Sequence, residues 1–141
     1  MQYTSPVCSI DIAPGWTPAE PISQQDGSDA IAFAPLGDDA LLTLTTFDPA
    51  VSRTDARTWV ELVAKVNRQK NRHVTRTHVG EFAGYYMWFE TDSIHMRAWA
   101  MLCGDQPLDV TYRCDVSIAG RDDALVDTML ATTQRSSKMT E

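Results

Sequence analysis

The sequence lacks the patterns that usually mark a catalytic or metal-binding protein. It has only three histidines, and His73 and His78 are five residues apart, so in a strand they would point to opposite faces. It contains no Cys-x-x-Cys pair and no glycine-rich phosphate loop. No Ser, Cys or His combination suggests a nucleophile beside its base. We therefore expect a non-enzymatic protein with no catalytic residues, no metal and no cofactor.

Long apolar runs and a secretory signal are also missing. The longest apolar runs are too short to span a bilayer, and the first ten residues carry neither a basic start nor an apolar stretch. The three cysteines, Cys8, Cys103 and Cys114, are an odd number without a close pair, which fits a reducing compartment. These absences predict a cytoplasmic location, no membrane insertion and free buried thiols.

Basic residues are absent from the first 52 positions, which contain seven acidic residues. Residues 53–76 have seven basic and two acidic residues, residues 77–141 have five basic and ten acidic ones, and the formal net charge is −7. Such a protein should repel nucleic acid and attract a basic partner. The basic segment has Trp59 as its one aromatic residue, so we interpret it as a solvated helix face and a connecting loop.

The length of 141 residues, with 43% hydrophobic and 22% charged residues, is typical of a single domain, here residues 1–141. A first strand is expected at residues 7–12, where Pro14-Gly15 would end an edge strand and fold Trp16 against the sheet. Strands are expected at residues 30–34 and 40–47. A helix should follow as far as about residue 71, capped by Ser52 or Thr54. Its predicted apolar stripe is Trp59, Leu62, Val63 and Val66.

The second half predicts three or four consecutive antiparallel strands between residues 74 and 116, the first of them bent or divided at Gly84. Turns are expected at residues 91–94 and 104–107. A final helix should follow Gly120, with an apolar stripe of Leu125, Val126, Met129 and Leu130. The chain from Gln134, including residues 135–141, is expected to fray. The order βββ-α-ββββ-α predicts an α+β fold with a mainly antiparallel sheet and two helices packed on it.

Turn positions predict the strand register. A turn at residues 92–93 places Tyr86 opposite Trp99 and Trp88 opposite Arg97. A turn at residues 105–106 would place Trp99 opposite Tyr112. One face then carries Tyr86, Trp88, Arg97, Trp99, Met101, Val110, Tyr112 and Cys114. The other carries Tyr85, Met87, Phe89, Met96, Ala98, Ala100 and Leu102.

Both faces are apolar, so both need a cover, and Ala98 and Ala100 leave room for a helix on the second face. The aromatic face has two interpretations. Either a helix or the N-terminal segment covers it, or part of it stays open as a groove rimmed by Arg97. In the second case the partner-binding residues are those whose types anchor protein interfaces, namely Tyr86, Trp88, Arg97, Trp99 and Tyr112. The alternatives are a small-molecule or lipid-binding module with an aromatic pocket between sheet and helix, and a hydrolase-like enzyme with dispersed residues. A second copy of the chain, as a homodimer, is a further candidate partner.

Two short motifs carry a resemblance to a known family. They are "IAPGW" at residues 12–16 and "FAGYYMWFE" at residues 82–90. With the order of elements, they resemble the PsbP-like fold, which is shared by an extrinsic subunit of photosystem II, a Ran-binding nuclear import factor and small bacterial proteins linked to type VI secretion. The resemblance implies binding without catalysis. It implies a cytosolic immunity protein or effector chaperone whose partner is a basic toxin or an apolar effector helix.

Overall fold

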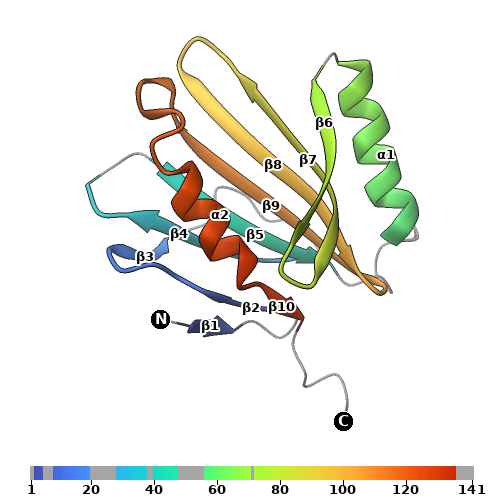
Figure 1. Ribbon diagram of the computed structural model, residues 1–141, viewed down its shortest axis with the longest axis horizontal. Coiled ribbons are helices and arrows are strands. Elements are labelled where there is room, and N and C mark those ends of the chain that lie inside the picture. The colour runs from blue at the N-terminus through green and yellow to red at the C-terminus, as the bar shows by residue number, and fades with distance from the viewer. Residues whose placement is uncertain are drawn as a thin grey trace.

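The computed structural model describes residues 2–4, 8–19, 28–37, 40–47, 56–70 and 72–135. These residues form an α+β fold in which two α-helices pack on a mainly antiparallel sheet (Figure 1). The elements are β1 (Gln2–Thr4), β2 (Cys8–Asp11), β3 (Trp16–Ala19), β4 (Ser28–Pro35), β5 (Ala40–Phe47), α1 (Ala56–Gln69), β6 (His73–Val79), β7 (Phe82–Glu90), β8 (Ile94–Cys103), β9 (Gln106–Asp115), the 3-10 helix η1 (Val116–Ile118), α2 (Asp123–Ala131) and β10 (Gln134–Arg135).

The strands form two antiparallel sheets. The large sheet has the order β3-β4-β5-β9-β8-β7-β6, and the small one has the order β1-β2-β10. The predicted order of seven strands and two helices is therefore confirmed, and three short strands (β1, β3 and β10) join it. The short β3 contains Pro18 and lies at the edge of the large sheet. Proline has no N–H to donate to a neighbouring strand, and an edge strand tolerates this because one of its sides has no neighbour.

Two predictions about the ends of the chain are wrong. Strand β2 is not an edge strand, because β1 and β10 pair with its two sides. The chain is not frayed at Gln134, since β10 pairs with β2 and Arg135 donates to the carbonyl oxygen of Cys103 at 3.2 Å. Residues 136–141 lie outside the described residues, as do the predicted caps Ser52 and Thr54. Trp16 is buried as predicted, with 7% of its surface exposed.

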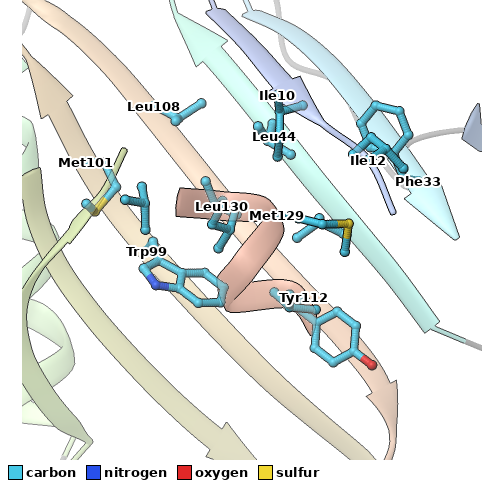
Figure 2. Packing of buried hydrophobic residues seen from close by; sticks show 14 of the residues in the cluster. Ile10, Ile12, Phe33, Leu44, Trp99, Met101, Leu108, Tyr112, Met129 and Leu130 are labelled. Carbon is cyan, nitrogen blue, oxygen red and sulfur yellow. The ribbon is translucent and has the colours of Figure 1, made fainter. Parts of the chain in front are cut away.

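Each face of the large sheet is covered by one helix. Helix α2 crosses the aromatic face together with β2, and α1 lies on the opposite face, beside β6 (Figure 1). The larger core fills the space beneath α2 (Figure 2). Beneath α1, Val60 and Ala64 pack against Tyr85 and Met87, with Ala98 alongside, as its small size suggested. Among the described residues, no helix is both long enough and apolar enough to cross a membrane.

The predicted apolar stripe of α1 is partly wrong. Val60 and Ala64 are its buried residues, whereas Leu62 is 53% exposed and Val66 is 38% exposed. Apolar residues occupy two sides of this helix, so spacings of three and four match more than one stripe. The sequence could not show which side of α1 would pack against the small residues of the sheet, such as Ala98.

The register prediction is confirmed between β7 and β8 and wrong by two residues between β8 and β9. Tyr86 lies opposite Trp99, but Trp99 lies opposite Val110 and Arg97 opposite Tyr112. The turn is one residue earlier than predicted, because Gly104 takes a positive φ of 61° there. A shift of two residues keeps every side chain on its face, so the two predicted faces stand.

The division of the first predicted strand does not occur at Gly84. That residue lies inside β7, opposite Met101, and the chain turns instead at Gly80 and Glu81. Gly80 has a φ of 56°, a conformation that side-chain-bearing residues rarely adopt. The turn therefore lies at Gly80, where the positive φ favours glycine, and not at Gly84.

Candidate functional site

The aromatic face of the sheet is divided into a buried part and an open part. Trp99 and Tyr112 are 3% and 1% exposed, and they lie next to α2, which contributes Met129 and Leu130 to the same cluster (Figure 2). The hydroxyl of Tyr112 donates to Asp122 at 3.0 Å. Burial is the main cause that raises the pKa of Tyr112, and the hydrogen bond to Asp122 raises it further. These two predicted site residues are therefore part of the core.

Arg97 is also buried, at 6% exposure, and it ties β8 to α2. Its Nε donates to the Tyr86 hydroxyl at 2.9 Å, its Nη2 donates to Asp127 at 2.7 Å, and its Nη1 lies 3.4 Å from Asp123. Burial acts to lower the pKa of Arg97, but the bonds to Tyr86 and Asp127 outweigh it and raise that pKa. Arg97 therefore holds the helix and does not rim the open part of the face.

The open part is a cleft of about 310 Å³ that we call the Trp88 cleft. It lies where β7 and β8 meet the loop before α2. Its lining residues are Tyr86, Trp88, Glu90, His95, Ala119, Gly120 and Asp123. Trp88 is 40% exposed, an unusual degree for so large an apolar side chain. Of the five predicted site residues, Tyr86 and Trp88 line this cleft.

The indole of Trp88 is held between two histidine rings. His73 on β6 stacks with it at a centroid distance of 6.2 Å, and His95 on β8 lies 5.9 Å away. His95 is fixed in turn, because its Nδ1 lies 2.8 Å from Glu90 Oε2. An exposed aromatic ring held in this way loses little conformational freedom when it binds a partner.

The chemistry of the Trp88 cleft is suited to a cationic group. The side chains of Glu90 and Asp123 are 40% and 43% exposed. One oxygen of each carboxylate faces a neighbour, His95 for Glu90 and Arg97 for Asp123, so a bound molecule would meet the other oxygen. A guanidinium or ammonium group over an aromatic ring is attracted by the ring and can pair with a nearby carboxylate. Trp88 offers such a ring beside these two carboxylates, whereas the ring of Tyr86 already has the guanidinium of Arg97 over it at 5.2 Å. The cleft can therefore hold a basic side chain.

Asp109 is a carboxyl with a raised pKa, and it lies away from the Trp88 cleft. Burial raises the pKa of this carboxyl to about 6. Asp109 lines neither the Trp88 cleft nor a second hollow of about 240 Å³ between α1 and β6. The described cysteines are free thiols, and burial raises the pKa of Cys114.

Sequence reasoning missed Glu90, His95 and Asp123 as site residues. Glu90 and His95 could have been found, because the turn at residues 92–93 places them opposite each other. Asp123 could not have been found, because it lies at the cleft only when α2 packs across the sheet, and the sequence does not specify that packing. The predicted aromatic pocket beneath α2 is filled by Val126, Met129 and Leu130.

Comparison with known proteins supports the fold. No protein-family model matches the chain, and no curated protein sequence matches it. A crystal structure of a protein from Bacteroides thetaiotaomicron has a TM-score of 0.67 at 12% identity, covering 98% of this chain and 49% of that protein. This chain thus spans about half the length of the Bacteroides protein.

Two further structures cover most of both chains. The cyanobacterial PsbP, CyanoP, of Synechocystis sp. PCC 6803 has a TM-score of 0.62 at 13% identity, over 96% of this chain and 92% of CyanoP. LpqN, which is involved in cell envelope biogenesis of Mycobacterium tuberculosis, has a TM-score of 0.51 at 8% identity, over 92% of this chain and 83% of LpqN. The PsbP-like fold predicted from the sequence is confirmed by CyanoP. Identities this low carry the fold alone.

Proposed function

We propose that the chain is a non-enzymatic domain that binds another protein, and that the Trp88 cleft is its point of contact. The observation that carries this proposal is the exposed indole of Trp88, held between two rings and flanked by Glu90 and Asp123. Tryptophan is among the residues that contribute most to protein interfaces, especially where its ring is held in place before binding.

The proposed partner is a basic protein. A formal net charge of −7 attracts a basic surface over long range and raises the rate of encounter. Within the cleft, an arginine or lysine side chain would lie against Trp88 and pair with a carboxylate. A volume of about 310 Å³ suits one or two side chains and is far too small for a whole helix. Of the two partners first considered, the cleft therefore favours the basic toxin over the apolar effector helix.

The finer proposal is that this is a cytosolic toxin-immunity protein, with the effector chaperone as its alternative. The acidic composition and the acidic, aromatic cleft support the immunity role, because such a protein inhibits by covering a basic surface. The link to type VI secretion comes from the resemblance to the PsbP-like group, whereas the cytosolic location is proposed from the odd number of cysteines without a close pair. The absence of catalysis is part of the same proposal, and its support is the lack of a sequence pattern that would place a nucleophile beside its base.

Co-purification with the product of the neighbouring gene tests the proposal, with the affinity measured by isothermal titration calorimetry. Trp88→Ala should weaken the complex at least about thirtyfold, the effect of an interface hot spot. Leu62→Ala is the matched control, because Leu62 is 53% exposed on the opposite side and should leave the affinity unchanged. Glu90→Gln should weaken binding and reduce its dependence on salt.

Three outcomes would contradict the proposal or redirect it. Equal binding by Trp88→Ala and the unchanged protein would remove the cleft from the interface. Failure to form a complex with the neighbouring product would count against the immunity role. Binding of a small cation such as tetramethylammonium at Trp88, without any protein complex, would favour the small-molecule alternative. Light scattering of the purified protein measures its mass in solution and so shows whether it forms a homodimer.

A further inference from the structure

A second hollow, which we call the α1–β6 cleft, lies on the face of the sheet opposite the Trp88 cleft. It has a volume of about 240 Å³. Helix α1 contributes Arg57 and Glu61 to its walls, and β6 contributes Arg76 and His78. Ala83 and Gly84 of β7 also line it, and their small size leaves the space open.

The α1–β6 cleft concentrates positive charge in an acidic protein. Six of the twelve lysines and arginines lie between Arg57 and Arg76, and Glu61 is the one acidic residue from 56 to 79. Folding brings Arg57 and Arg76, which are distant in the sequence, to one hollow. The guanidinium of Arg68 lies 5.3 Å from the ring of Tyr85 in the same region. Arg76 contacts the same ring at 5.7 Å, so two cations of the basic segment lie at one buried tyrosine. The basic side chains of α1 stay exposed, as the predicted solvated helix face requires.

The contacts inside the cleft leave cationic groups available. The hydroxyl of Tyr85 donates to both carboxylate oxygens of Glu61, at 3.0 and 2.9 Å, and this fixes the single acid. Arg76 reaches the same hydroxyl at 3.5 Å, the limit of a hydrogen bond. Arg57 forms no hydrogen bond or ion pair within the part of the chain that the structure describes. Two guanidinium groups thus border the hollow, and most of their donors bond to none of the residues that the structure describes.

We propose that the α1–β6 cleft binds a compact oxyanion, held by Arg57 and Arg76. Guanidinium groups bind carboxylates and phosphates through two parallel N–H bonds, which a single ammonium cannot do. A hollow of about 240 Å³ is smaller than most pockets for drug-sized ligands, so it takes a small anion or one acidic group of a larger molecule. This site carries the opposite charge preference to the Trp88 cleft and does not depend on the proposed function.

Titration of the full chain with small anions tests the site, with backbone amide chemical shifts as the readout. The probes are inorganic phosphate, succinate and a tetraglutamate peptide, at low ionic strength. Saturable shifts at Gly84 and Arg76 are expected with at least one probe. Free phosphate or succinate would identify a small-molecule site, and the peptide alone would identify a site for an acidic segment of another protein. Absence of saturable shifts with all three probes would overturn the proposal.

Charge-matched variants separate a specific site from a general charge effect. Arg76→Gln and Arg57→Gln should each weaken binding about tenfold, since each removes charge-assisted hydrogen bonds. Lys65→Gln removes the same charge from an exposed position of α1 outside the cleft, and it should weaken binding less than about twofold. Glu61→Gln should tighten binding, because it removes the competing negative charge while an amide oxygen can still accept from Tyr85.

Equal losses in Lys65→Gln and Arg76→Gln would overturn the proposal, because they would show that only the overall charge matters. Trp88→Ala serves as a further control and should leave anion binding unchanged. This result separates the two sites, so failure of one proposal does not decide the other.

Discussion

Replacing Asp109 by asparagine should stabilise the protein at neutral pH. Asp109 lies in β9, opposite Thr45 and Ala100, on the face of the sheet that α1 covers. Its carboxylate has no hydrogen-bond or ion-pair partner within the part of the chain that the structure describes. Burial of an unpaired charge disfavours the ionised form, and it raises the pKa of Asp109 from 3.8 to about 6.

The size and sign of the effect follow from this pKa. The folded protein binds a proton at Asp109 more tightly than the unfolded chain does, so the stabilisation by that proton is complete below pH 3.8 and is lost as the pH rises through about 6. A difference of about two pH units corresponds to about 3 kcal/mol at high pH. The residue is partly exposed, and water reduces the cost, so we expect a gain of about 1 to 3 kcal/mol from Asp109→Asn.

Urea unfolding between pH 4 and pH 8 measures this gain. The free energies of unfolding of the two proteins should nearly coincide at pH 4 and separate as the pH approaches 7. The gain should appear in thermal unfolding as an increase in Tm of roughly 3 °C per kcal/mol. Asp92→Asn, at an exposed turn residue, is the matched control and should show no such separation.

Two results would refute the reasoning. A stability difference that is constant from pH 4 to pH 8 would show that asparagine acts through packing and not through charge. A less stable variant at pH 7.5 would show that the carboxylate is stabilised by a contact. Only the difference between the two proteins is informative, because the lowered pKa values of Asp115 and Asp122 add contributions to the pH dependence that have the opposite sign.

Three further predictions concern the core of the sheet. Gly84→Ala should cost 2 kcal/mol or more, roughly, in urea unfolding, because the added methyl would collide with the carbonyl oxygen of Ala100; wild-type stability would contradict this close approach. Arg97→Met should cost about 2 kcal/mol in urea unfolding at pH 7, because it leaves Asp123 and Asp127 without their cation; a variant as stable as the unchanged protein would contradict the role of this ion pair. Ellman's reagent should modify Cys103 before Cys114, which is 1% exposed and whose pKa is raised by burial; equal rates would show that β9 opens readily.

The candidate site was predictable in part. Tyr86 and Trp88 share a face because side chains alternate along a strand, and this alternation survived the error in the β8–β9 register. The same alternation placed Trp99 and Tyr112 on that face but could not show that α2 would bury them. The exposure of a side chain depends on which helix or strand packs over it, and the alternation of side chains along a strand contains no information about that element.

The role of Arg97 shows the same limit. Its position on the aromatic face followed from the turn at residues 92–93, as did its pairing with Trp88. An arginine among aromatic residues is typical of interfaces, so the sequence favoured a binding role. In the structure its donors are taken by Tyr86 and Asp127, because α2 brings an acidic turn over the sheet. Arg97 therefore holds α2 on the sheet, because its partner Asp127 comes from a distant segment of the chain.

The sequence by itself determined the order of the elements, the antiparallel meander, the two faces of its strands and the acidic charge. These features depend on local signals, namely apolar alternation, helical spacing and turn residues, which neighbours along the chain provide. Only the tertiary structure decided which part of the aromatic face stays open and that Arg57 and Arg76 border one hollow. It also decided that Asp109 is largely shielded from water and has no partner among the described residues. These features arise where distant segments meet, and the free energy of such contacts depends on distances and burial that no local pattern specifies.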